Sequence, residues 1–395
     1  MSFDLPPYDG PLVIIPLALL AALLTGWLLV RAGLLDIPDE TRRLGCLDGL
    51  RGYLALMVAV HHFDIWRNVF QGLSWGAPSG HLYNNLGQAG VGLFFMASGA
   101  LFYRKVAKEM LRLDWVSLYL SRLFRIVPLM WLATALVLLL VLYRGGTPQS
   151  SDGAALLKWL TFVANPDLMG HPHTSRIIAH VVWSLRYEWV FYFALPLLAL
   201  VLSVTSPRRV PNILVLIAGT AVLLFVPGLW FGPFAGILIS FFGLGMIAVE
   251  LASWPRVNRL LSRWPVAFLG IAALATQMKV FPGAFNPISG VLLFAFFTPV
   301  LAGNSYFGLL TRKGSIALGE VSYGIYLLHG IVLSVWMEDL IPRIGERFGA
   351  SWLALPLLLV IIVLLATLTF LLVEKPMITA GKHLARLRRP ARARA

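Results

Sequence analysis

The sequence predicts an all-α fold, a polytopic membrane bundle of about eleven transmembrane helices. The 395 residues are 58% apolar and 13% charged, whereas globular chains carry roughly 45–50% apolar and about 25% charged residues. The apolar residues form blocks long enough to cross a hydrocarbon core about 30 Å thick. These blocks are continuous rather than alternating, which excludes a transmembrane barrel.

Composition and charge exclude several other classes. A soluble interior could not bury this apolar excess, and disorder, coiled coil, collagen and disulfide scaffold do not fit it. The single cysteine, Cys46, cannot form an internal disulfide. The net charge of +14 could indicate nucleic acid, but the basic residues are scattered between apolar blocks. This pattern is typical of loop charges that orient a membrane protein. We therefore expect no nucleic-acid partner, although a basic pocket for a phosphorylated cofactor could lie within the pattern.

The first predicted span is Pro11–Val30. The preceding residues, Met1 to Gly10, contain two aspartates and no Lys or Arg, so they do not resemble a signal peptide. We expect a retained span. The later predicted spans are 47–66, 88–105, 126–143, 178–203, 211–228, 230–252, 265–281, 285–306, 316–337 and 351–373.

The positive-inside rule predicts the orientation of these spans. With the N-terminus outside, most of the 32 basic residues fall on the cytoplasmic side. The tail, residues 377–395, is then a basic cytoplasmic segment facing lipid headgroups. The loop Arg144–Arg176 lies outside, and its part 153–163 predicts a short amphipathic helix on the membrane surface. This loop carries His171 and His173, but no Cys or carboxylate stands at ligand spacing, so we expect no metal site.

Ionisable residues inside spans are costly and indicate function. Arg51 and His62 are eleven residues apart, which places them on one helix face about 16 Å apart. Snorkelling by Arg51 and a carbonyl bond by His62 would be the structural alternative, but the combination favours a site.

Two further blocks lie between this helix and the middle of the chain. Residues 90–99 combine several glycines with Ser98, and helix packing is the favoured role, although Ser98 could donate into a cavity. Arg122 and Arg125 share a face at the start of a span. Ordinary orientation charge and a clamp on phosphates explain this pair equally well.

Two later blocks complete the set of intramembrane polar residues. In the first, Ser184 and Glu188 lie one turn apart, and Arg186 could pair with a carboxylate elsewhere. In the second, Ser322, Tyr326 and His329 form a polar stripe. Hydrogen bonds between helices and contacts with sugar hydroxyls remain equal alternatives for both blocks.

These blocks, in this order, resemble the acyltransferase-3 family, membrane O-acyltransferases that modify bacterial surface glycans and other hydroxylated acceptors. The resemblance runs from Leu47 to Pro376. The motifs that carry it are Arg51 with His62; Arg122, Arg125 and Pro128; Trp183, Ser184, Leu185, Glu188, Phe191 and Tyr192; Ser322–His329; and Val373–Pro376.

The sequence also departs from the family pattern. Gly92 stands where an acidic residue is common, and Trp189 follows Glu188 where a second acid is common. The family core usually has ten spans, so residues 1–46 would add an extra helix and connection ahead of the core, 47–376. We expect no hydrolase-like domain of the kind that follows the core in some relatives.

The resemblance implies transfer of an acyl group, usually acetyl from cytoplasmic acetyl-CoA, to a hydroxyl of a glycan or lipid-linked saccharide. Catalytic roles fall to His62, the general base, and Glu188, which would fix its tautomer if close. An acyl-histidine intermediate is the less favoured version. Arg51, Arg122 and Arg125 would bind acyl-CoA. The expected acceptor-binding residues are Ser98, Trp183, Ser184, Tyr323, Tyr326 and His329.

The location that follows is the bacterial inner (plasma) membrane, with lipid on all sides, the N-terminus outside and the C-terminus cytoplasmic. His61, rotated 100° from His62, should tolerate substitution much better than His62. The rival class is a transporter or flippase of a lipid-linked glycan. It predicts repeats between the chain halves, and none is visible in the sequence.

Overall fold

The computed structural model describes residues 10–37, 45–78, 80–205, 211–225, 234–344 and 350–387. Every regular element within these ranges is helical, and the one isolated β-bridge joins Leu168 to His171. The first half contains α1 (Pro11–Arg31), α2 (Gly45–Phe70), α3 (His81–Glu109), α4 (Trp115–Tyr143), α5 (Asp152–Leu160) and α6 (Val182–Thr205). The second half contains α7 (Asn212–Phe225), α8 (Ala235–Ser253), α9 (Pro255–Leu261), α10 (Trp264–Val280), α11 (Pro287–Leu301), α12 (Lys313–Glu320), α13 (Ser322–Ser334), α14 (Ile341–Ile344), α16 (Leu355–Thr369) and α17 (Lys375–Leu387).

The helices form a membrane bundle, as the sequence predicts. Seven described helices are long and apolar enough to cross a bilayer, and the helices at 212–224, 264–280 and 287–301 are apolar but shorter. The eleven predicted segments all fall on helices, but the number of spans is not fixed at eleven. The helix α2 is not among the seven. Its 26 residues would extend roughly 39 Å, but they include charged residues and two histidines.

Local signals explain where several helices begin. Asp114 caps α4 by accepting a hydrogen bond from the backbone N–H of Ser117 at 3.0 Å. Asn286 caps α11 in the same way, through Ser289. Proline stands in the first turn of α1, α9, α10, α11 and α16, where its missing N–H costs nothing.

Two predicted spans are interrupted. The span predicted at 178–203 starts later, at Val182, because Ala179 and His180 adopt left-handed backbone angles that no helix continues. The span predicted at 316–337 breaks at Val321 into α12 and α13, and a π-helix, η5 (Val335–Leu340), follows α13. Both interruptions adjoin cavities described below.

Glycines bring the central helices into backbone contact. A Cβ on Gly99 would overlap the backbone of Phe242, and one on Gly245 would overlap the backbone of Met96, so α3 and α8 cross closely. The same reciprocity joins α2 and α12. The packing role predicted for the glycine-rich segment 90–99 is confirmed here. Gly92, where an acid is common in the family, lies against the ring of Phe241.

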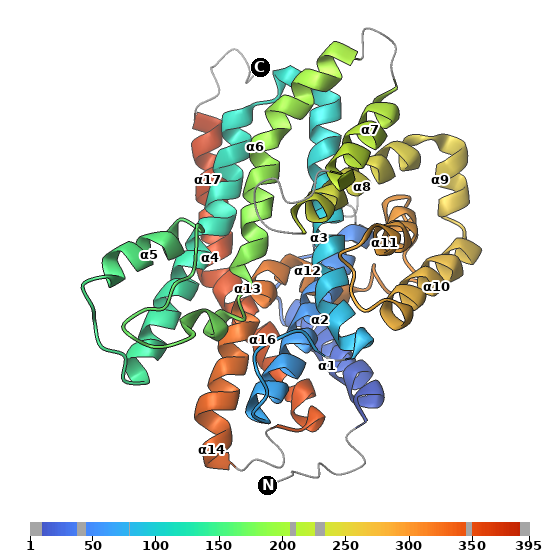
Figure 1. The fold of residues 1–395 in the computed structure, drawn as a ribbon. Coiled ribbons are helices and arrows are strands. Elements are labelled where there is room, and N and C mark those ends of the chain that lie inside the picture. Colours follow the sequence, from blue (N-terminus) through green and yellow to red (C-terminus); the bar gives the residue numbers. More distant parts are fainter. Residues whose placement is uncertain are drawn as a thin grey trace.

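Figure 1 shows the arrangement around these crossings: α3, α4, α6 and α17 run through the upper part, and α5 lies at the side of α4. We name the end where α3 ends and α4 begins the basic end, and the end where α4 ends and α6 begins the loop end. The predicted surface helix is α5. The tail begins as α17, which packs on α4 with Gly381 against Phe124; residues 388–395 lie outside the described part, as do residues 1–9 and 38–44 of the predicted N-terminal segment.

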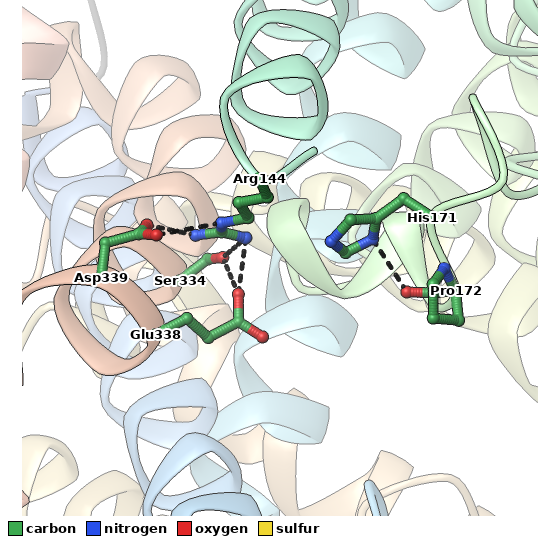
Figure 2. A network of polar contacts seen from close by, with 6 residues as sticks. All are labelled: Arg144, His171, Pro172, Ser334, Glu338 and Asp339. Atoms are coloured by element: carbon green, nitrogen blue, oxygen red, sulfur yellow. Dashed lines mark hydrogen bonds and ion pairs between the residues drawn. The ribbon is translucent and has the colours of Figure 1, made fainter. Parts of the chain in front are cut away.

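A charged cluster ties the loop end together (Figure 2). Arg144, directly after α4, makes ion pairs of 2.5 Å with Glu338 and with Asp339 of η5. Its guanidinium also donates to Ser334 at 2.9 Å. His171 lies nearby in Figure 2, and its Nδ1 donates to the carbonyl of Pro172 at 3.0 Å. In the chain as described, no three His, Cys, Asp or Glu side chains gather at metal-binding distance.

Candidate functional site

Two cavities lie one behind the other along the bundle axis. Each of the helices α2, α3, α6 and α13 contributes lining residues to both cavities. The basic cavity, toward the basic end, has a volume of about 440 Å³. The histidine cavity, toward the loop end, has a volume of about 290 Å³. Val91 and Tyr326 line both cavities and so form the wall between them.

The basic cavity brings together charged residues from five helices, α2, α3, α4, α6 and α12. Its basic lining residues are Arg51, Arg104, Lys105, Arg122 and Arg125, and its acidic ones are Asp48, Glu188 and Glu320. Five helix-borne cations around one space of this size favour an anionic ligand. The three arginines predicted to bind the donor do lie together.

Hydroxyl groups line the deeper part of the basic cavity. Ser184 lies 2.7 Å from the hydroxyl of Tyr326, which also donates to the carbonyl of Val181 at 3.3 Å. Tyr323 donates to the carbonyl of Ile126 at 2.8 Å. Ser322 is buried, and its hydroxyl has no hydrogen-bond partner in the described chain, so it remains available to a ligand.

Glu188 is not placed beside His62. Its carboxylate accepts hydrogen bonds from Ser98 at 3.0 Å and from Tyr192 at 2.9 Å. It lines the basic cavity, whereas His62 lines the histidine cavity. The expectation that Glu188 orients the His62 ring is therefore wrong. The reason is local, because Tyr192 lies one turn further along α6 and its hydroxyl donates to the Glu188 carboxylate.

His329 takes the position beside His62 that was expected for Glu188. The Nε2 atom of His329 lies 3.0 Å from Nδ1 of His62, and the ring centroids are 5.0 Å apart. His329 is completely buried. Its expected role as an acceptor-binding residue does not match this place, since it contacts the candidate base and lines neither cavity.

The hydrogen bonds assign the tautomers of this pair. Nδ1 of His329 lies 3.1 Å from the carbonyl of Ile325, and a carbonyl can only accept, so this Nδ1 carries the proton. In the neutral ring Nε2 of His329 is then an acceptor. Nδ1 of His62 donates to it and to the carbonyl of Val58, which is 3.0 Å away. Nε2 of His62 is left unprotonated and has no hydrogen-bond partner in the described chain, which is the state that a general base requires.

His61 lies in the same cavity. Its Nδ1 donates to the carbonyl of Tyr83 at 2.8 Å, and its ring meets that of His62 edge to face at 4.9 Å. Although His61 is the next residue after Val60 and is rotated from His62 on the helix, its ring also reaches the cavity, because it fits against Gly87, where a Cβ would overlap it. The two histidines differ in that only His62 has a second imidazole behind it.

The rest of the histidine cavity is aromatic and amide-bearing. The lining includes Trp75, Asn84, Gln88, His180, Trp183 and Phe285, and none of the described lining residues is a carboxylate. Trp75 meets the ring of His180 at 5.3 Å, and the guanidinium of Arg176 lies 5.7 Å from Trp75. Burial and the nearby Arg176 lower the pKa of His180, so its ring is neutral near pH 7. Trp183, which was expected to bind the acceptor, lines this cavity, while Trp75 and His180 were not expected here.

Other expected contacts are absent. Arg186 forms no ion pair within the described residues, and its Nε atom is buried without a partner. Sequence reasoning gave no role to five polar residues of the basic cavity, which are Asp48, Arg104, Lys105, Tyr192 and Glu320. Ser322, a member of the predicted polar stripe, also lines it. Arg104 and Lys105 could have been found, because they follow Ser98 on the same predicted span.

Comparison with known proteins gives one match over most of the chain. Residues 44–372 match the acyltransferase-3 family model, described as an acyltransferase domain. The chain is also 21% identical over 241 residues to the lincomycin resistance protein LmrB of Bacillus subtilis (strain 168), over 55% of this chain and 45% of that protein. The chain thus spans about half the length of that curated relative. No solved structure matches the present chain.

Proposed function

The chain belongs to the acyltransferase-3 family, and we propose that it transfers an acyl group, acetyl in the simplest case, from acyl-CoA to a hydroxyl of a glycan or lipid-linked saccharide. The observation that carries this proposal is the unprotonated Nε2 of His62. The other ring nitrogen of His62, Nδ1, is hydrogen-bonded to His329, and the ring lies in a cavity that shares a wall with the basic cavity.

The chemistry follows from the tautomer of His62. Nε2 removes the proton of the acceptor hydroxyl as the oxygen attacks the thioester carbonyl, because a neutral alcohol is a weak nucleophile. The tetrahedral intermediate then expels the CoA thiolate. The proton taken up by His62 passes to the leaving sulfur, so the ring returns to its neutral state. Behind it, the uncharged Nε2 of His329 accepts from Nδ1–H and stabilises the imidazolium.

The donor is assigned to the basic cavity. Its cations are suited to phosphate groups, since a guanidinium donates in pairs to phosphate oxygens. Arg51 and His62 are separated by about 16 Å along α2. The pantetheine arm would cross this distance toward His62, passing Val91 and Tyr326. No metal ion is required in this scheme.

The acceptor is assigned to the histidine cavity. Indole faces and side-chain amides are suited to a sugar ring, which presents apolar C–H faces and hydroxyl edges. Without a carboxylate in the lining, an uncharged or anionic sugar is favoured over a cationic one. The volume of about 290 Å³ matches the reacting unit of a longer acceptor rather than a whole chain.

We also propose the membrane placement expected from the charge pattern. The basic end faces the cytoplasm of a bacterial cell at the inner membrane, with the N-terminus outside and the C-terminus inside. Residues 47–376 form the catalytic bundle. Residues 1–46 add the helix α1, which packs on α12 and α16, and 377–395 are the basic tail.

The experiment is acyl transfer by the purified protein in detergent. Acetyl-CoA and a short glycan acceptor are supplied, released CoA is measured by its thiol, and the acetylated product is identified by mass spectrometry. A transporter or flippase would release no CoA in an acceptor-dependent way, and such a result with folded protein would overturn the proposal. Surface glycans of a deletion strain, compared by mass spectrometry, would then identify the acceptor.

A further inference from the structure

The rim of the basic cavity carries two cations for which the resemblance provides no role. Arg104 is half-buried and Lys105 is exposed, and both line the cavity from α3. Neither forms an ion pair within the described residues. The nearest opposite charge on its own helix is Glu109, one turn beyond Lys105, and Arg122 lies close enough to repel the ammonium.

The helix positions set the order of the cations along the cavity. The guanidinium of Arg122 lies 5.2 Å from the ring centroid of Phe102. Lys105 is one turn beyond Phe102 toward the basic end, about 4.5 Å along the axis. Because α4 runs in the opposite direction, Arg125 lies one turn deeper than Arg122. The rim pair, Arg104 and Lys105, therefore lies nearer the basic end than the deeper pair, Arg122 and Arg125, and Arg122 is the member of the deeper pair closer to the rim.

Two separate pairs of cations fit a ligand with two separate phosphate groups. CoA is such a ligand: a diphosphate adjoins its pantetheine arm, and a phosphomonoester lies at the far, ribose end. If the arm enters first, the diphosphate lies at the deeper pair and the phosphomonoester at the rim. Acyl groups carried on protein-bound phosphopantetheine have only one phosphodiester and would leave the rim pair unoccupied.

We propose that Arg104 and Lys105 bind the 3′-phosphate of the acyl donor and make the enzyme selective for CoA thioesters over carriers that lack this group. The inference rests on the proposed function, since it takes the basic cavity as the donor site. It adds a specificity determinant outside the motifs of the family.

The test compares the binding of CoA and 3′-dephospho-CoA by the full chain in detergent, using calorimetry, so that it does not depend on catalysis. The unmodified protein should bind CoA at least about 10-fold more tightly. The double variant Arg104→Gln/Lys105→Gln should lose most of this ratio and bind dephospho-CoA as before. Arg122→Gln should weaken both ligands together, because both retain the diphosphate.

Lys108→Gln is the matched control, because Lys108 is an exposed lysine on the same end of α3 that does not line the cavity. It should retain the ratio, as should the charge-conserving Arg104→Lys/Lys105→Arg. An equal affinity of the unmodified protein for both ligands, or an unchanged ratio in the double glutamine variant, would refute the inference while leaving acyl transfer intact. Failure to bind either ligand would refute the donor assignment itself.

Discussion

In a neutral imidazole only one of the two ring nitrogens can accept a proton. The hydrogen bonds of the other nitrogen determine which one it is. At His62 this decision is made by His329, whose Nδ1 is fixed by the carbonyl of Ile325. The arrangement resembles a triad in its logic, with an imidazole in the orienting position where a carboxylate is more usual. A neutral orienting group leaves the charge of the transition state to be stabilised by polarisation rather than by an ion pair.

We expect His62→Ala to reduce acyl transfer by about 10²- to 10⁴-fold, the usual contribution of a general base. The variant should remain folded in detergent, since the ring borders a cavity. His61→Ala is the matched control. This substitution also removes a residue that lines the cavity, but His61 has no second imidazole behind it. The variant should therefore mainly raise the KM for the acceptor. An inactive His61→Ala beside an active His62→Ala would reverse the assignment.

His329 gives a second prediction for the same network. His329→Leu removes the acceptor for Nδ1–H of His62, and kcat should fall by about 10-fold or more, roughly 1.4 kcal/mol in the barrier. The KM for acetyl-CoA should change little. His329→Gln keeps an acceptor oxygen and should recover part of kcat. If Leu and Gln behave alike, and the pH profile of kcat is that of the unmodified protein in both, His329 has only a packing role.

The sequence predicted the members of this site better than their partners. Helical periodicity placed Arg51 and His62 on one face, and the motifs brought Arg122, Arg125, Ser184 and Tyr326 into consideration. The pairing of His62 with His329 depends on how α2 packs against α13, across 267 positions of chain. Side-chain period within one helix carries no information about such a contact. Trp75 was missed for another reason, because it stands in an irregular segment without periodicity.

Among the elements, the end of α13 has the least regular backbone near the site. The π-helix η5 widens the turn after Ser334 and presents Glu338 and Asp339 to Arg144 (Figure 2). A π-turn disrupts normal helical hydrogen bonds and persists where other contacts offset that cost. The ion pairs provide them and tie α13, which carries His329 and Tyr326, to the end of α4.

Arg144→Ala should therefore destabilise the loop end by about 1.5–3 kcal/mol, the range for hydrogen bonds to charged groups. The side chain of Arg144 is only 10% exposed, so the two carboxylates would lose a largely buried partner. Thermal unfolding in detergent measures the change. Arg343→Ala is the control, because Arg343 is exposed and, among the described residues, donates to the hydroxyl of Tyr143 rather than to a carboxylate. An equal loss in both variants would mean that the cluster contributes nothing specific.

The element boundaries show where sequence patterns were insufficient. Hydrophobicity alone joined 178–181 to α6 and joined α12 to α13, since apolar and small residues outnumber the polar ones in both segments. The left-handed angles at Ala179 and His180 and the break at Val321 are set by tertiary packing. Gly330, for example, lies against the backbone of Ile178 and Ala179, which lets the irregular segment approach α13.

For the whole molecule, the two cavities predict a reaction divided between the two sides of a membrane. In vesicles of known orientation, product should form when acetyl-CoA is supplied at the basic end and acceptor at the loop end. The reason is the position of His62 beyond the wall formed by Val91 and Tyr326. Product formed only when both substrates are at the basic end would contradict this arrangement. Vesicles containing His62→Ala control for leakage of either substrate.

The wall between the cavities has an electrical consequence. Two water-accessible spaces that approach each other from opposite faces of a bilayer leave little low-dielectric material between them, so most of the membrane potential would fall across that short distance. Here it would fall across the side chains of Val91 and Tyr326, with the hydroxyl of Tyr326 held at Ser184. In the proposed reaction, a donor arm that crossed this wall would have to fill the opening itself, or protons would follow it. In the proposed membrane placement, the hydrogen bond between Tyr326 and Ser184 would therefore also limit the leak of protons between the two sides.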